Sequence, residues 1–104
     1  MDTFEAIYGR RSIRAFSKID VTRTQLTKIL EAGRQAPSAG NLQPWELVVV
    51  RDSNRKMALA QAAHGQYFIA EAPVVVVVCV HPARSARHYG NRGASLYCLQ
   101  DTAA

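Results

Sequence analysis

The sequence predicts a single domain of the mixed helix-and-strand class, and three observations lead to this prediction. Capping-box patterns at 2–5 and 22–25 each precede apolar residues at helical spacing. Two valine-rich runs, 46–50 and 74–80, have the length and composition of strands. With 104 residues, of which 48% are hydrophobic and 20% charged, the chain has the size and composition of one globular domain.

The first helix is expected to start after Asp2, because Glu5 lies three positions further on and completes a capping box. Its short apolar face contains Phe4, Ile7 and Tyr8, and Gly9 is expected to end it as a C-cap. A second helix should begin at the other capping box and run to about residue 35.

A strand over 46–50 follows, and its nearly uninterrupted apolar sequence predicts that both of its faces are covered. Ser53 is expected to cap a third helix, with Gly65 at its end. The side chains expected to point inward from this helix are Met57, Leu59, Ala60 and Ala63. A short helical turn should then occupy 66–71 and carry Phe68 and Ile69.

The run 74–80 contains five consecutive valines and predicts a fully buried central strand that His81 and Pro82 close. The polar segment 83–92 is expected to be a mobile loop, and a helix should begin at about Ala94. No helix-ending signal follows in 101–104. We therefore expect a domain that spans 1–104 and is incomplete at its C-terminus.

The charge of the chain favours an anionic partner. The formal net charge is +5, and Arg outnumbers Lys by ten to three. Guanidinium groups pair with phosphate and carboxylate oxygens in a bidentate manner, so this bias favours specific anion contacts. A nucleic acid, a phosphorylated ligand and an acidic surface all remain open on charge alone.

The remaining composition points to a reducing, cytoplasmic setting without a membrane partner. Cys79 and Cys98 are too few for a disulfide framework, and their apolar neighbours suggest small buried residues. No signal peptide is recognisable at the N-terminus. The longest apolar run, 72–80, is far shorter than a membrane span.

The first candidate site is the sequence Arg-Arg-Ser-Ile-Arg at 10–14. In an extended segment, Arg10, Ser12 and Arg14 point to one face, where they could bind a phosphate. The alternative is a solvated basic turn, or one that docks on nucleic acid. Two apolar residues are expected to anchor the segment in the core: Ile13 and Phe16.

The second candidate site is the stretch 36–45, which lacks apolar periodicity although it lies between a helix and a strand. Pro37 and Pro44 fix their own φ, and Gly40 permits a positive φ. Ser38 and Asn41 can bond to nearby backbone groups. An ordered loop of this kind suits a flat ligand with a polar edge. The alternative is a tight connection whose terminal Trp45 is simply part of the core.

Taken together, these segments resemble the N-terminal half of the nitroreductase family of FMN-dependent oxidoreductases. The resemblance lies in RRSIR, APSAGNLQPW, AEAPVVVVVCV and the Tyr-containing helix that leads to Gln100 and Asp101, and it covers essentially the whole chain. It implies an α+β sandwich, in which helices flank a mixed, mostly antiparallel sheet, here apparently truncated. It also implies an obligate homodimer with one FMN in each of two clefts at the interface.

The resemblance further implies ping-pong chemistry, in which NAD(P)H reduces FMN and FMN then reduces a small acceptor such as a nitroaromatic or a quinone. No side chain needs to be catalytic, because the cofactor carries the hydride. Arg10 and Ser12 match positions that hold the FMN phosphate and ribityl chain, and Arg11 matches a neighbouring contact. Arg14 matches a residue that reaches the N1–C2=O edge of the flavin, where a cation tunes the potential.

The loop residues Pro37, Ser38, Ala39 and Asn41 match the family's flavin-lining loop, which commonly comes from the partner subunit. Trp45 is expected to pack beneath the site. Two alternatives remain beside this interpretation. One is a flavin-binding protein without turnover, and the other is a basic domain that binds anions or nucleic acid.

The scattered arginines and the lack of helix-turn-helix or zinc spacing disfavour nucleic acid, and we expect no nucleic-acid partner. No metal is expected either, since His64, His81, His88 and the cysteines lack zinc-like spacing.

Overall fold

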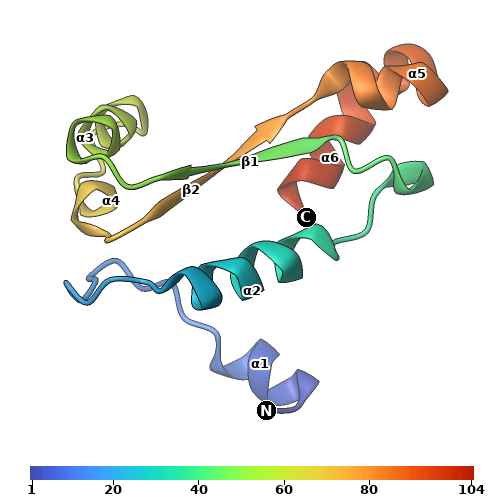
Figure 1. Ribbon diagram of the computed structural model, residues 1–104. Coiled ribbons are helices and arrows are strands. Elements are labelled where there is room, and N and C mark those ends of the chain that lie inside the picture. The colour runs from blue at the N-terminus through green and yellow to red at the C-terminus, as the bar shows by residue number, and fades with distance from the viewer.

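The computed structural model describes residues 1–104 and has a two-stranded antiparallel sheet at its centre (Figure 1). Strands β1 (Trp45–Val50) and β2 (Val75–Val80) pair in a register that places Trp45 opposite Val80 and Val50 opposite Val75. Helix α2 (Arg23–Arg34) runs alongside the sheet. Helix α1 lies on the far side of α2, and the helices after β1 gather at the two ends of the strands, which leaves much of the sheet accessible.

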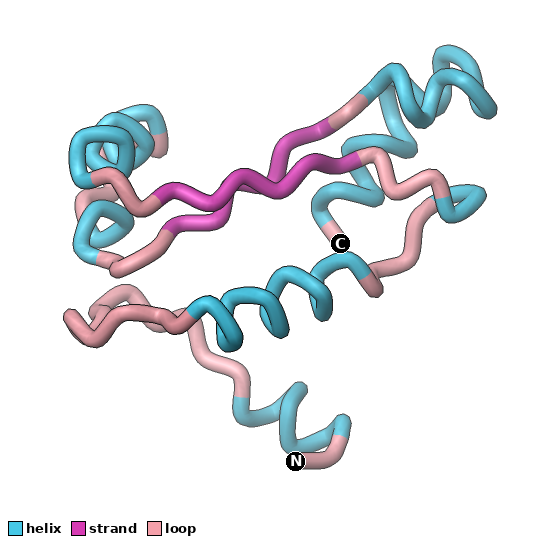
Figure 2. Tube along the Cα trace, in the orientation of Figure 1, coloured by secondary structure: helices cyan, strands magenta, loops and turns pink.

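Figure 2 shows how loops join these elements. The remaining helical elements are α1 (Thr3–Gly9), the 3₁₀ turn η1 (Ala39–Asn41), α3 (Ser53–Ala62), α4 (Phe68–Glu71), α5 (Pro82–Arg92), the π-helical turn η2 (Gly93–Tyr97) and α6 (Cys98–Ala103). Helices α3 and α4 lie at one end of the sheet, and α5, η2 and α6 lie at the other. None of the helices combines the length and the apolar composition needed to span a bilayer.

Both predicted capping boxes are confirmed, at the start of α1 and at the start of α2. Two other cap assignments were wrong. Gly9 is the last residue of α1 but has no positive φ, and Arg10 leaves the helix directly into extended backbone (φ −58°, ψ 135°). The cap of α3 is Asp52 rather than Ser53, because the Asp52 carboxylate reaches the Arg55 N–H at 2.9 Å.

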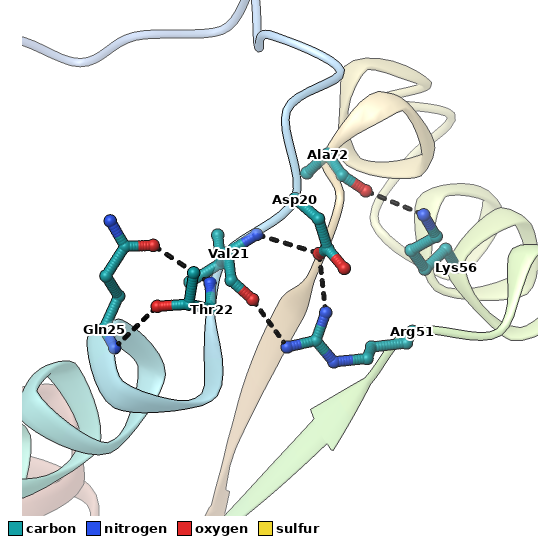
Figure 3. A network of polar contacts seen from close by, with 7 residues as sticks. All are labelled: Asp20, Val21, Thr22, Gln25, Arg51, Lys56 and Ala72. Carbon is teal, nitrogen blue, oxygen red and sulfur yellow. Dashed lines mark hydrogen bonds and ion pairs between the residues drawn. The ribbon is translucent and has the colours of Figure 1, made fainter.

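The inward face of α3 differs in part from the prediction. Ala60 is fully buried, and Gly65 follows the helix with a φ of +72°. Met57, however, is 42% exposed, so its inward placement was wrong. The buried face is set by Lys56 and Ala60, four positions apart, and Met57 lies to one side of it. The Lys56 ammonium donates to the Ala72 carbonyl at 2.7 Å, which explains its burial (Figure 3).

The strands lie where the sequence predicts them, but the prediction that both faces of the sheet are covered was wrong. Val48 is 47% exposed and Val78 is 48% exposed, whereas the strand ends Trp45 and Val50 are buried. The reason is geometric. Only two strands pair, and the helices at their ends do not reach across both faces. Both cysteines are free; Cys98 is fully buried.

The segment 83–92 is helical, so the prediction of a mobile loop was wrong. His81 Nδ1 accepts a hydrogen bond from the Arg84 N–H at 3.3 Å, and Pro82 occupies the first turn of α5. The same His-Pro pair was interpreted only as the end of a strand. Gly90 (φ +58°) interrupts the helix. The chain then passes so close to Ser85 that a Cβ at Gly93 would lie 2.5 Å from the Ser85 carbonyl oxygen.

Candidate functional site

The basic segment 10–14 belongs to no helix or strand, begins in extended backbone at Arg10 and is exposed throughout. No backbone N–H from Arg11 to Phe16 donates a hydrogen bond within the chain. The backbone N–H groups of this segment are thus unpaired, and its guanidinium groups bond to no carboxylate. Such a donor set suits an anion with several oxygens, such as a phosphate ester.

The three arginines of this segment carry positive charge that no carboxylate of the chain offsets, since the four ion pairs lie elsewhere. Arg10 Nη1 donates to Ser12 Oγ at 3.3 Å, which brings these two side chains together. Arg11 Nη1 donates to the carbonyls of Tyr8 and Arg10, both at 2.8 Å. The Arg14 guanidinium lies 6.0 Å from the centre of the Phe68 ring.

The predicted anchors of the segment behave differently from each other. Phe16 packs against Phe68, with 6.2 Å between the ring centres, but remains 39% exposed, so it contacts α4 without being buried in the core. Ile13 is 67% exposed, so its predicted burial was wrong. Ile13 belongs to an extended stretch that no helix or strand of this chain covers, whereas Phe16 reaches the aromatic ring that α4 presents.

A polar network ties the chain just before α2 to the sheet (Figure 3). Arg51, just after β1, donates to the Asp20 carboxylate at 2.6 Å and to the Val21 carbonyl at 3.0 Å. The next residue, Thr22, is the cap of α2. The network therefore fixes the start of α2 against the end of β1.

The second candidate site, the loop over residues 36–45, is ordered, as predicted. Three of its residues have a positive φ: Gly40 (+61°), Asn41 (+54°) and Gln43 (+50°). Inside the loop, Ser38 Oγ accepts from the Gln43 N–H at 3.0 Å, and the Ser38 carbonyl accepts from the Asn41 N–H at 2.9 Å. Ser38 thus closes the loop upon itself, as its residue type suggested.

Side chains from the second half of the chain hold this loop from outside, and the sequence interpretation did not foresee them. The Asp101 carboxylate accepts from the Ala39 N–H at 3.1 Å. Arg84 Nη1 donates to the Gln43 carbonyl at 2.7 Å, and Thr102 Oγ1 donates to the Pro44 carbonyl at 3.4 Å. Trp45, 7% exposed, closes the loop in the core, as predicted.

The two candidate sites do not meet within one chain. Arg10 and Arg14 precede α2, while Pro37 and Asn41 follow it, and Figure 1 shows the two segments beyond opposite ends of that helix. The twelve residues of α2 alone span about 18 Å. The two segments therefore lie apart within a single chain.

No group of three or more His, Cys, Asp or Glu side chains comes together in a way that could hold a metal ion. A groove of about 510 Å³ opens between the end of α2, the two strands and α6, but Arg10 to Arg14 do not line it. The basic segment and the loop remain the two candidate sites.

Comparison with known proteins establishes the relationship of this chain. Residues 7–104 match the sequence profile of the nitroreductase family. The chain belongs to the nitroreductase family. It is 53% identical over 78 residues to a protein of Thermus thermophilus named NADH dehydrogenase, in an alignment that covers 75% of this chain and 38% of the relative. It is 35% identical over 78 residues to the FMN reductase [NAD(P)H] of Bacillus subtilis, covering 75% of this chain and 31% of the relative.

Solved structures confirm that the chain has the α+β fold of the nitroreductase family. The NADPH:FMN oxidoreductase of Vibrio harveyi, complexed with NAD⁺, superposes with a TM-score of 0.82 at 31% identity over 97% of this chain and 46% of its own. Nitroreductase A of Vibrio parahaemolyticus superposes with a TM-score of 0.83 at 30% identity, over 99% of this chain and 47% of its own. The chain thus spans about half the length of these relatives, or less.

Proposed function

We propose that the protein is an FMN-dependent oxidoreductase that takes hydride from NAD(P)H and passes it to a small acceptor such as a nitroaromatic or a quinone. The observation that carries this proposal is the uncompensated basic segment Arg10 to Arg14, with unpaired N–H groups beside it. Membership of the nitroreductase family supports it, as do the relatives named for FMN and NAD(P)H.

The residues of the basic segment fit the anionic end of FMN. Arg10 and Ser12, which already lie within hydrogen-bond distance of each other, would hold the phosphate and the ribityl chain. Arg11 would provide a neighbouring contact. Arg14 would place positive charge at the N1–C2=O edge of the flavin. When bound, FMN would supply the hydride chemistry, and a cation at that edge stabilises the charge that reduction creates.

We further propose that the loop comes to the same FMN from a second copy of the chain. Pro37, Ser38, Ala39 and Asn41 would line the flavin, and the loop's left-handed turn would present its backbone groups. The separation of the two segments by the full length of α2 supports this arrangement. The working unit is then a homodimer with an FMN at the interface. Free cysteines are compatible with a cytoplasmic setting.

The proposal is tested with the purified complete protein. Its visible absorbance spectrum and its mass by light scattering are measured before and after FMN is added, and NADH and NADPH oxidation is then followed with menadione and a nitroaromatic. We expect flavin bands on a dimer and acceptor-dependent oxidation. A folded protein that takes up no FMN contradicts the proposal. Stable FMN binding without any NAD(P)H oxidation would instead favour the flavin-binding protein without turnover.

A further inference from the structure

One contact of the loop joins parts of the chain that are far apart in sequence. Asp101 lies on α6, and its Oδ2 accepts a hydrogen bond from the Ala39 N–H at 3.1 Å, across 62 positions. The Asp101 side chain is half-buried and forms no ion pair. Its contact within the chain is therefore directed at the backbone of the loop.

The position of this contact within the loop matters. Ala39 immediately precedes Gly40 and Asn41, which have φ values of +61° and +54°. Left-handed backbone costs free energy at Asn41, although less than at most residues with a side chain, so contacts from outside the turn help to hold it. The bonds of Ser38 close the loop internally but do not fix where it lies relative to the sheet. Arg84 and Thr102 attach the exit of the loop, and the Asp101 carboxylate attaches the entry to its turn.

We propose that Asp101 is a positioning residue that holds the loop of Pro37 to Asn41 in the conformation that receives the flavin. This inference rests on the proposed function, because it assumes that the loop faces FMN. Asp101 acts through the Ala39 N–H and does not itself contact the cofactor. A carboxylate that accepts from a backbone N–H makes a charge-assisted bond, stronger than its neutral counterpart.

The side chain at 101 can be varied in steps. Asp101→Ala removes the acceptor, whereas Asp101→Asn keeps a carbonyl oxygen in the same place and loses only the charge. Gln100→Ala is the matched control, because Gln100 is the neighbouring exposed residue on α6 and its side chain makes no hydrogen bond. All variants are made in the complete protein, and their folding is checked by far-UV circular dichroism.

The first readout is amide hydrogen exchange of the loop in protein without FMN. Asp101→Ala should speed exchange at Ala39 and its loop neighbours about tenfold, as loss of one charge-assisted bond predicts. Asp101→Asn should restore most of the protection, and Gln100→Ala should leave it unchanged. If a folded Asp101→Ala variant exchanges at the wild-type rate in the loop, the proposal is wrong.

The second readout is the dissociation constant for FMN, measured by quenching of flavin fluorescence. It should rise about tenfold in Asp101→Ala and less than threefold in Asp101→Asn. An unchanged constant in Asp101→Ala contradicts the positioning role. Failure of the proposed function has a different signature, since the wild-type protein would then not bind FMN at all, while the exchange measurement would still report whether Asp101 holds the loop.

Discussion

Arg84 on α5 donates a hydrogen bond of 2.7 Å to the backbone oxygen of Gln43, a residue whose φ is +50°. The same guanidinium donates to the Trp45 carbonyl at 3.2 Å and pairs with the Glu46 carboxylate at 2.6 Å. One side chain thus secures the exit of the loop and the first residues of β1. Together with Asp101 at the entry, Arg84 makes the loop conformation depend on the helices that follow β2.

Replacement of Arg84 by Met should therefore lower the free energy of unfolding by about 2 kcal/mol, the scale of hydrogen bonds made by a charged group. The Trp45 carbonyl and the Glu46 carboxylate would lose the Arg84 donor, and the Gln43 carbonyl would keep only its bond from the Trp45 N–H. Chemical denaturation of the complete protein measures the change. Arg87→Met on the same helix is the control, because Arg87 is exposed and makes no hydrogen bond or ion pair. Equal losses in the two variants would show that the Arg84 contacts contribute nothing specific.

Gly40 is required by the loop for two reasons that can be separated. Its φ is +61°, and a Cβ built on it would lie 2.8 Å from the Tyr89 hydroxyl. Gly40→Ala should cost about 1–2 kcal/mol from the left-handed backbone alone, with a further loss from the contact. Thermal unfolding measures the stability of Gly40→Ala alone and of Gly40→Ala combined with Tyr89→Phe. Removal of the Tyr89 hydroxyl should restore only the stability lost through the close contact, and not the loss from the left-handed backbone.

Gly33 provides the control for Gly40. It lies within α2, has no positive φ, and a Cβ there meets no atom within 4 Å. Gly33→Ala should therefore raise stability by up to about 1 kcal/mol through helix propensity. A Gly40→Ala variant as stable as Gly33→Ala would contradict the conformation described for the loop.

The N-cap of α3 is Asp52 in the structure, whereas the sequence pattern indicated Ser53. Asp52→Ala should lower stability by about 1 kcal/mol, since its carboxylate accepts from the Arg55 N–H. Ser53→Ala should change little, because the Ser53 side chain makes no hydrogen bond. Denaturation of both variants under the same conditions checks the assignment, and a larger loss for Ser53→Ala would reverse it.

Residue patterns along the chain predicted most of the helices and both strands, because capping boxes and valine runs act locally. These patterns predicted burial wrongly where it depends on which other elements of the chain pack against a strand or helix. The exposure of Val48 and Val78 follows from how few elements cover the sheet, which no local pattern encodes. Pro82 was a usable helix-start signal, but it was assigned to the end of a strand instead.

The candidate site also has features that the sequence predicted and features that it did not. The clustering of positive charge at Arg10 to Arg14 and the positive φ at Gly40 followed from residue type, whereas the exposure of Ile13 did not. The contact of Asp101 with Ala39 could not be foreseen, because it joins residues 62 positions apart through a backbone N–H that has no sequence signature.

Arg14 should affect the flavin itself. Arg14→Ala is expected to weaken FMN binding about tenfold or to make the midpoint potential of bound FMN more negative, since a cation near N1 favours the reduced, anionic form. Fluorescence titration and spectroelectrochemistry measure the two quantities. Arg23→Ala, at the exposed start of α2, is the control. If neither quantity changes in Arg14→Ala, the role proposed for Arg14 is wrong.

The central claim is that one FMN site takes its basic segment from one chain and its loop from the other. It is tested with two double variants of the complete protein, Arg10→Ala/Arg14→Ala and Ser38→Ala/Asn41→Gly. Each alone should bind FMN about tenfold or more weakly than wild type. Asn41→Gly keeps the left-handed backbone that this position requires (φ +54°).

The two variants are coexpressed with different affinity tags, and the hybrid dimer is purified through both tags for FMN titration. An interface site built from both chains leaves one intact site and one doubly altered site in each hybrid, so about one FMN per dimer should bind with wild-type affinity. If each site were built within a single chain, every site in the hybrid would be defective. A hybrid without any wild-type site would therefore contradict the account.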